Sequence, residues 1–225
     1  MSRSRLPSPP QPDVLARQTQ AASKVARTAA QEVRIIGGQW KRTPLPVPLA
    51  AGLRPTPARV RETLFNWLGQ DLTGWRVLDS FAGSGALGLE AASRGAASVC
   101  LLERDPALAR SLKAVVQRLL PPGRTAPPSV SVTQTEALSW MAQHAARQDA
   151  PFDLVFLDPP FDEGLFESAL KAAMRCVPPG GWIYVEAPQE LGVDALEGLR
   201  RQRHARAGAV HFHLFERVGE PTQPA

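Results

Sequence analysis

The chain has 225 residues, 44% of them hydrophobic, which is enough for one domain with a sizeable core and some extensions. No apolar run approaches the roughly 18 to 20 residues needed to cross a bilayer, so membrane-spanning classes are excluded. The first thirty residues lack the apolar core of a signal peptide, and we expect a cytoplasmic protein, although their Arg, Ser and Ala content also resembles an organelle transit peptide.

Charge is distributed unevenly along the chain. The first 61 residues hold eleven of the 26 Lys and Arg residues but two of the 21 acids, a net charge of +9, so the remainder has a net charge of −4. A basic arm on a near-neutral domain is typical of a nucleic-acid-binding protein. A tail that only improves solubility has the same composition.

The N-terminal part divides into a tail and an extension. Residues 1–32 are rich in Pro, Ser, Gln and Ala, and we expect a disordered basic tail. Residues 33–42 predict a short strand and a glycine turn, and the proline-interrupted residues 45–48 predict an edge segment. We interpret residues 33–70 as an extension that binds nucleic acid and covers a ligand held by the domain that follows it.

A helix is predicted after Thr56, which fits an N-cap with Pro57 at the first helical position and an apolar stripe over residues 60–68. Arg59 and Arg61 flank the first residue of that stripe and are available to phosphate or merely solvated. The candidate RNA contacts of the extension are Arg34, Lys41, Arg42, Arg54, Arg59 and Arg61.

From residue 75 onward, strand and helix patterns alternate. The predicted strands are 76–79, 98–103, 129–133, 152–157 and 182–186, and the predicted helices are 86–93, 106–119, 136–147 and 163–176. This spacing predicts an α/β fold, a mostly parallel sheet built by right-handed crossovers with helices on both faces. Two later segments, 194–200 and 204–217, fit one or two antiparallel closing strands. The catalytic domain is expected to span residues 71–225.

A glycine-rich loop joins the first of these strands to its helix. Residues 83–88 have the spacing of a dinucleotide site, and Glu103 ends the next strand, where a ribose-binding acid belongs, so NAD is one candidate ligand. However, Asp79 at the strand end would repel a phosphate, and the Phe81-Ala82 spacer lengthens the turn. A carboxylate there favours the sulfonium and ammonium groups of S-adenosylmethionine, which has no phosphate.

The expected cofactor ligands surround this loop. Glu103 is placed to bind the ribose hydroxyls, with an ordinary solvated acid as the alternative. Glu136 is a candidate for the adenine amine or, equally, the first-turn acid of a helix. The full predicted set is Asp79, Phe81, Ala82, Gly83, Ser84, Gly85, Glu103, Glu136 and Asp158.

A second motif follows the predicted strand 152–157. This strand is a continuous apolar run, as expected of a strand buried on both faces, and ligands bind past the carboxyl ends of such strands. The prolines after it hold the loop rigid and leave carbonyls free to accept hydrogen bonds beside a carboxylate and an aromatic ring. Such a cluster suits a nucleobase with an exocyclic amine, and a plain turn is the alternative. The candidate catalytic residues are Asp158, Pro159, Pro160 and Phe161.

Together, segments 79–85 and 158–161 resemble the class I methyltransferases that methylate exocyclic amines of nucleobases. Segments 34–40, 52–56 and 59–67 resemble one family, the bacterial RsmD-type 16S rRNA guanine-N2 methyltransferases, and the resemblance runs from about residue 33 to residue 217. It implies a class I methyltransferase (Rossmann-like) fold with a seven-stranded sheet, S-adenosylmethionine as cofactor, and a guanine of 16S rRNA as acceptor, in naked RNA or in a small subunit or its assembly intermediate.

Carried over by position, the resemblance implies that residues 83–85 and Glu103 hold the cofactor and that residues 158–161 hold the base. Ser80 stands where the family frequently has Cys, which should be harmless, and Glu136 stands where Asp or Asn is more frequent. The basic tail and the Pro-rich insert at 121–128 are not part of the family pattern.

The implied reaction is attack of the guanine N2 amine on the sulfonium methyl group. Asp158 and the Pro159 carbonyl would accept the N–H bonds of the amine and aim its lone pair, with Asp158 a candidate proton acceptor and Phe161 stacked on the base. The nearest competing function is an adenine-N6 methyltransferase acting on DNA or RNA, but Asp rather than Asn at position 158 favours guanine. A non-catalytic RNA-binding assembly factor and a dehydrogenase are also compatible with parts of the pattern, and the two intact loops argue against the assembly factor.

No metal is expected. Cys100 and Cys176 have no pairing or ligand spacing and fit reduced structural thiols. His144, His204, His211 and His213 have no ligand spacing either, and a surface pair is the favoured interpretation of the last two. We expect a monomer.

Overall fold

The computed structural model describes residues 33–47, 56–120, 128–161, 164–192 and 197–219. No helix within these ranges is both long and apolar enough to cross a membrane. The expected disordered tail, residues 121–127 of the Pro-rich insert and the candidate RNA contact Arg54 lie outside them.

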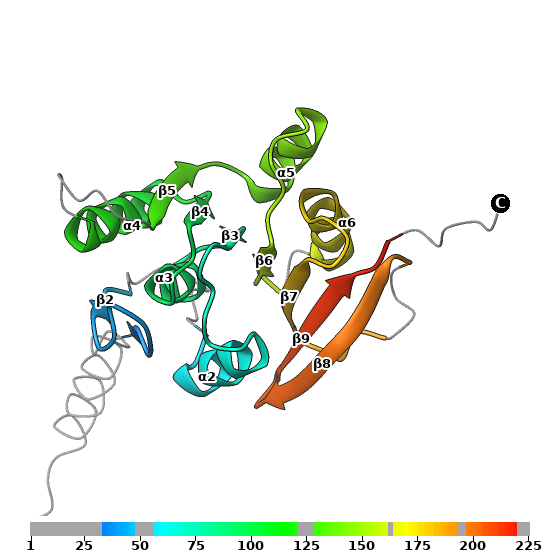
Figure 1. Cartoon of the computed structure of the whole chain (residues 1–225), viewed down its shortest axis with the longest axis horizontal. Coiled ribbons are helices and arrows are strands. Elements are labelled where there is room, and N and C mark those ends of the chain that lie inside the picture. Colours follow the sequence, from blue (N-terminus) through cyan, green and yellow to red (C-terminus); the bar gives the residue numbers. More distant parts are fainter. Residues whose placement is uncertain (1–32, 48–55, 121–127, 162–163, 193–196, 220–225) are drawn as a thin grey trace, which may run out of the picture.

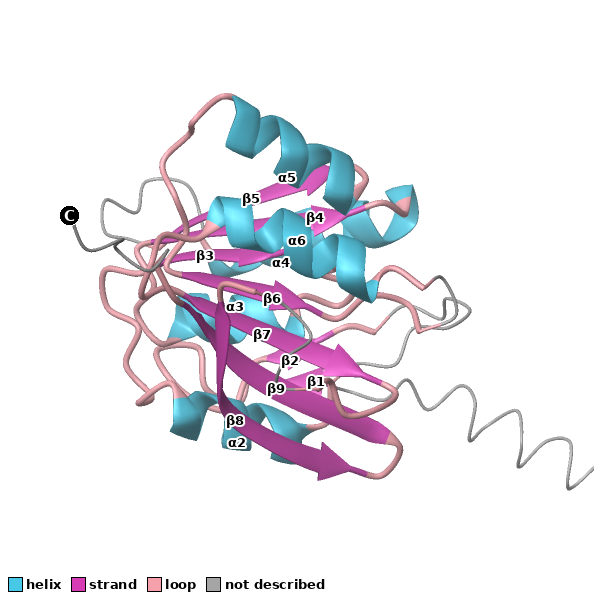
Figure 2. Cartoon of the chain, turned by 90° about the vertical axis from the view of Figure 1, so that its right-hand side faces the viewer, coloured by secondary structure: helices cyan, strands magenta, loops and turns pink. Residues whose placement is uncertain are grey.

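One seven-stranded sheet forms the centre of the molecule (Figures 1 and 2). Its strands lie in the order β5-β4-β3-β6-β7-β9-β8. Neighbours from β5 to β7 are parallel, whereas β9 is antiparallel to both β7 and β8. The expected mostly parallel sheet with antiparallel closing strands is confirmed. The strands are β3 (Arg76–Asp79), β4 (Ser98–Glu103), β5 (Ser129–Gln134), β6 (Leu154–Leu157), β7 (Trp182–Ala187), β8 (Leu199–Ala207) and β9 (Val210–Arg217).

Helices cover both faces of this sheet (Figure 2). One face carries α2 (Ala58–Trp67), α3 (Ala86–Ser93) and α4 (Pro106–Leu119), whose buried side chains share one apolar cluster. The other face carries α5 (Ala137–Ala146) and α6 (Phe166–Cys176), which belong to a second cluster. Because crossovers between parallel strands are right-handed, the chain changes face when it passes from the β3-β4-β5 half of the sheet to β6 and β7.

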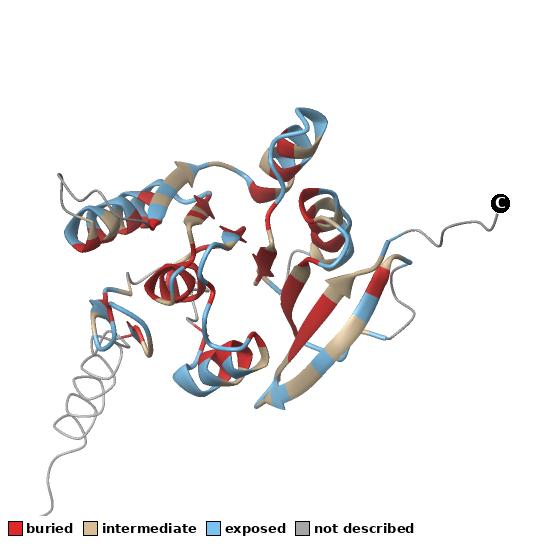
Figure 3. Cartoon of the chain, in the orientation of Figure 1, coloured by how far each residue is buried: buried red, intermediate tan, exposed pale blue. Residues whose placement is uncertain are grey.

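The middle strands are buried on both faces (Figure 3). All four residues of β6 are buried, and successive side chains enter opposite clusters: Leu154 and Phe156 lie on the α2 side, Val155 and Leu157 on the α6 side. A strand with two apolar environments needs no polar alternation, which explains the continuous apolar run in the sequence.

The N-terminal segment packs against α3. Its strands β1 (Val33–Arg34) and β2 (Pro44–Leu45) pair with each other, and the two carboxylate oxygens of Glu90 accept the backbone N–H bonds of Ile36 and Gly37 at 2.7 Å each. The segment therefore shares the core of the domain instead of forming its own. Its contributions to the α2-side cluster are Val33, Ile35, Trp40 and Leu45.

Two expectations about the start of α2 are wrong. Thr56 is not the N-cap, because the helix begins at Ala58 with Pro57 as its N-cap, and the Thr56 side chain lies beside Glu186 instead. Arg61 is not a surface contact for phosphate, because it lies on the buried face of α2 and is 2% exposed. Its guanidinium donates to Glu90 of α3 at 3.2 Å. Arg61 therefore forms a buried ion pair, whereas the sequence predicted a side chain in contact with solvent or phosphate.

Candidate active site at the carboxyl edge of the sheet

Four carboxylates lie at one edge of the sheet because four strands end there. Asp79 is the last residue of β3, Glu103 is the last residue of β4, Asp158 directly follows β6, and Glu186 is the penultimate residue of β7. The parallel register aligns these strand ends, with Asp79 opposite Phe156 and Leu157 opposite Val185. The predicted cofactor loop and acceptor loop are therefore side by side.

The glycine loop is attached to the neighbouring strand β4. Glu103 accepts the Gly83 N–H at 2.9 Å through one carboxylate oxygen and the Asp105 N–H at 2.8 Å through the other. The Ala82 N–H donates to the carbonyl of Leu102 at 2.9 Å. Glu103 thus holds the glycine loop in shape. Its expected contact with the ribose hydroxyls of the cofactor stays a prediction.

The Asp79 carboxylate lies against the N-terminal turn of α3. Its carboxylate accepts the Gly88 N–H at 2.9 Å, and a Cβ at Gly88 would come within 3.0 Å of that carboxylate and 2.3 Å of Leu101. The negative charge and the filled N–H leave this helix terminus unsuited to a pyrophosphate. Burial raises the pKa of Asp79 to about 7, with a further contribution from the charge of Glu103.

The acceptor loop combines a shielded carboxylate with an exposed ring. Pro159 is buried, whereas Phe161 is 39% exposed and lies with its ring centroid 5.8 Å from that of Phe166. Burial raises the pKa of Asp158 well above its ordinary value, and the negative charges of Glu186 and Asp79 raise it further. A carboxylate with a raised pKa is a stronger proton acceptor than an ordinary aspartate.

Glu186 and its partners belong to the site but were not predicted from the sequence. The Glu186 carboxylate is 4% exposed and accepts the hydroxyl of Tyr184 at 3.0 Å, and Thr56 lies close enough to lower its pKa against the effect of burial. An acid at the end of a buried strand was the signal that identified Asp158, and the same signal is present at the end of β7. The contact with Thr56 joins residues 130 positions apart and has no local signature.

Glu136 caps a helix. Its carboxylate accepts the N–H bonds of Leu138 and Ser139 at 2.9 and 2.7 Å, at the N-terminus of α5. Desolvation raises the pKa of Glu136, but the hydrogen bonds from Ser139 and Leu138 together outweigh it, so the pKa lies below its ordinary value. The helix-terminus role is thus observed, and a contact with adenine stays a prediction.

The predicted RNA contacts are spread over the molecule. Arg34, Lys41, Arg42 and Arg59 are exposed. The turn that carries Lys41 and Arg42 is bonded to the last turn of α3 through Gln39 and Trp40, and so lies near the edge where the strands begin. Arg59 lies in the first turn of α2, three residues after Thr56, which lies beside Glu186 at the carboxyl edge.

Residues 33–216 match the family described as conserved hypothetical protein 95. The Escherichia coli protein named ribosomal RNA small subunit methyltransferase D is 41% identical over 208 residues, which cover 88% of this chain and 96% of the relative. The protein of the same name from Haemophilus influenzae is 39% identical, over 84% of this chain and 95% of the relative.

Solved structures agree with this relationship. The yhhF methyltransferase of Escherichia coli superposes with a TM-score of 0.71 at 41% identity, over 84% of this chain and 99% of the other. The Thermus thermophilus 16S rRNA N2-guanine methyltransferase RsmC, solved with AdoMet and guanosine, has a TM-score of 0.60 at 22% identity over 84% of this chain and 50% of the other, which supports the fold. With its family match over residues 33–216 and relatives of this identity and coverage, the chain belongs to the RsmD-type ribosomal RNA methyltransferase family.

Proposed function

We propose that this protein transfers a methyl group from S-adenosylmethionine to the exocyclic N2 amine of a guanine in 16S rRNA. The observation that carries the proposal is the meeting of the Gly83–Gly85 loop and the Asp158–Phe161 loop at one edge of the sheet. The relatives named as small-subunit ribosomal RNA methyltransferases support the substrate class.

The residues of the first loop fit the cofactor. The backbone of Gly83 and Gly85 has positive φ angles of 52° and 77°, which gives a tight loop with little side-chain bulk. Glu103 at its flank offers a carboxylate to ribose hydroxyls, and Asp79 disfavours the pyrophosphate of NAD. When bound, S-adenosylmethionine supplies an electrophilic methyl group on a sulfonium ion.

The second loop orients the acceptor amine. The lone pair of guanine N2 is delocalised into the ring, so the amine must be turned toward the methyl group to react. Asp158 and the carbonyl of Pro159 accept its two N–H bonds, while Phe161 stacks on the base and contributes about 1 to 3 kcal/mol. Asp158 then takes the proton that the methylated nitrogen loses.

We also propose that the RNA contacts Arg34, Lys41, Arg42 and Arg59, and that the substrate is naked 16S rRNA or a small subunit during assembly. Lys41 lines a groove of mixed charge together with Asn66, Gln70, Arg94 and the acids Glu62 and Asp71. The named relatives do not favour an adenine methyltransferase or a non-catalytic assembly factor. An rRNA substrate fits the cytoplasmic location expected from the sequence.

The test separates binding from chemistry. Asp158→Ala should abolish incorporation of tritiated methyl groups into small-subunit rRNA, while calorimetric titration shows nearly unchanged affinity for S-adenosylmethionine and none for NAD, because the carboxylate faces the base. The exposed acid Glu167, changed to Gln, is the control and should keep full activity. Near wild-type turnover in Asp158→Ala, or methylation of an adenine, would contradict the proposal.

A further inference from the structure

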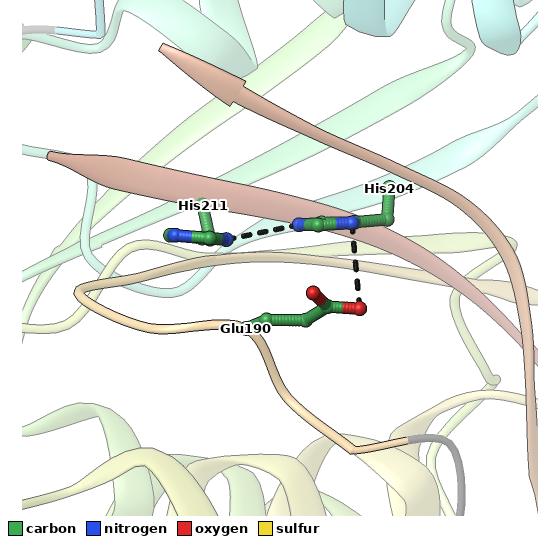
Figure 4. Close-up of side chains that lie close together, drawn as sticks. All are labelled: Glu190, His204 and His211. Atoms are coloured by element: carbon green, nitrogen blue, oxygen red, sulfur yellow. Dashed lines mark hydrogen bonds and ion pairs between the residues drawn. The ribbon is translucent and has the colours of Figure 1, made fainter. Parts of the chain in front are cut away.

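A cluster of two histidines and a glutamate lies on the face of the sheet that carries α5 and α6 (Figure 4). Nε2 of His204 is 3.0 Å from Nδ1 of His211, and Nδ1 of His204 is 3.6 Å from a carboxylate oxygen of Glu190. Each residue offers one ligand atom within 4.8 Å of those of the other two. Over the described parts of the chain, this is the one group of three or more such side chains close enough to share an ion.

The register of β8 and β9 creates this cluster. His204 pairs directly with His213, and His211 lies two residues earlier on β9, so all three rings stand on the same face. Their planes are nearly parallel, with centroids 4.6 to 6.5 Å apart. The expected surface pair of His211 and His213 is wrong, because His213 is fully buried and His204 takes its place beside His211.

The loop that carries Glu190 is held in place by its neighbours. The N–H of Leu191 donates to Nε2 of His213 at 3.1 Å, and Arg201 donates to the carbonyl of Leu191 at 3.1 Å. Both bonds join the loop after β7 to the β8-β9 pair. Glu190 therefore approaches the two histidines from a fixed backbone, as a binding site requires.

We propose that Glu190, His204 and His211 bind a divalent transition metal ion of the zinc type. Two imidazole nitrogens and one carboxylate oxygen are a ligand set that zinc accepts, with further positions left to water. At Zn–N bonds of about 2.0 to 2.1 Å, tetrahedral ligands stand about 3.3 Å apart, so the His204 and His211 nitrogens need to separate only slightly. The spacing of these residues in the sequence does not indicate the site, because the pairing of β8 with β9 brings His204 and His211 together.

The ion has one competitor in the structure. Arg201 donates to Oε1 of Glu190 at 2.7 Å, and this is the same oxygen that lies 3.6 Å from Nδ1 of His204. The metal therefore binds Glu190 through Oε2 or displaces Arg201 from Oε1, and the charge of Arg201 weakens the binding in either case. The ion would cross-link the loop after β7 to the edge strands, and His211 pairs with Ala187, which follows Glu186 of the active site.

The test is a calorimetric titration of the full chain with zinc chloride, paired with the visible absorption of bound Co²⁺. We expect one ion per chain and a higher melting temperature with zinc. Glu190→Gln and His211→Ala should each weaken zinc binding at least about tenfold and remove the rise in melting temperature. Glu190 is half exposed on a loop, so its variant keeps the fold even if the His211 variant does not.

Gln202→Ala, on the same strand as His204, is the control and should bind zinc like the wild type. The absence of saturable zinc binding by the wild type would overturn the proposal. Equal zinc affinity in the Glu190→Gln and wild-type proteins would overturn it as well, since the ion would then lie elsewhere.

Discussion

The buried carboxyl group of Asp79 makes the stability of the protein depend on pH. Its carboxylate is 3% exposed, and burial raises its pKa to about 7, so the folded chain holds the proton more tightly than the unfolded chain, where the pKa is about 3.9. Proton binding by Asp79 therefore stabilises the folded chain. This stabilisation is fully present below a pH of about 3.9 and is lost as the pH rises through about 7.

We therefore predict that Asp79→Asn, which keeps an acceptor for Gly88, gains free energy of unfolding relative to the wild type as the pH rises from 4 to 8. The relative gain is up to about 4 kcal/mol for three pKa units. Urea denaturation at several pH values measures it, with the exposed Asp149→Asn as control. Parallel stability curves for the wild type and Asp79→Asn would show that Asp79 does not titrate in this range.

Glu186 acts on Asp158 through its charge. After burial, the charge of Glu186 is the larger of the two that raise the pKa of Asp158. If Asp158 accepts a proton, methyl transfer falls as the pH drops through that pKa. Glu186→Gln removes the charge, and we predict that the acid limb of the rate profile moves to lower pH.

The measurement for this prediction is the rate of rRNA methylation across the acid range, compared with the exposed-acid variant Glu167→Gln. An unmoved acid limb in Glu186→Gln would mean that Asp158 does not limit the rate at low pH.

At the scale of elements, Gly85 ties the loop to the packing of α3. Its φ is 77°, and a Cβ there would lie 2.7 Å from Leu112 and 2.9 Å from Leu89. Gly85 belongs to the loop predicted to hold the cofactor, and its Cβ position is crowded from inside the protein by these two leucines. A valine at this position would disturb both cofactor binding at the loop and the packing of α3.

We predict that Gly85→Ala is destabilising by about 1 to 3 kcal/mol, from left-handed backbone strain and overpacking. Gly74→Ala is the matched control, because its φ is 85° but no atom lies within 4 Å of its Cβ position. Denaturant midpoints should fall more for Gly85→Ala. Equal losses would assign the whole effect to backbone strain.

Glu90 joins three elements. It is fully buried and binds Arg61 of α2, Arg94 at the C-cap of α3 and two backbone N–H groups of the N-terminal segment. Removing its charge leaves Arg61 buried without a counter-ion, so Glu90→Gln should cost about 3 to 5 kcal/mol of stability. Thermal or urea unfolding measures the loss, and the exposed Glu62→Gln should show almost none. A loss below about 1 kcal/mol would contradict the central role of Glu90.

At the scale of the whole molecule, the candidate RNA contacts lie toward both edges of the sheet. Four to six residues of strand separate those edges, about 13 to 20 Å. We propose that an RNA contacting Lys41 and Arg42 as well as Phe161 passes along the side formed by α2 and α3. This path is long enough for several nucleotides.

We predict that replacing Lys41 and Arg42 together by Ala lowers affinity for small-subunit rRNA and flattens its salt dependence by about 0.7 to 0.9 for each phosphate group that is no longer bound. Cofactor affinity should not change. The matched control removes two exposed charges from α4, Arg110 and Lys113. Deleting residues 1–30 should reduce methylation less than the double substitution. If the deletion reduced methylation more than the double substitution, the main RNA contacts would lie in the tail.

The sequence by itself determined the elements and the two loops. Strands β3 and β4 and helices α3 and α4 have the expected bounds, because apolar periodicity, proline and glycine act over a few residues. Asp79 and Asp158 were found as strand-end acids for the same local reason.

Only the tertiary structure decided which charges are buried and which distant side chains meet. Arg61 and Glu90 are 29 positions apart, Thr56 and Glu186 are 130 apart, and neither pair has a local signature. His204 and His211 meet through strand register, which the sequence left open as one or two strands. From the sequence, Arg61 beside the apolar stripe of α2 is expected to contact solvent. The packing of α2 against α3 buries it and places Glu90 as its counter-ion.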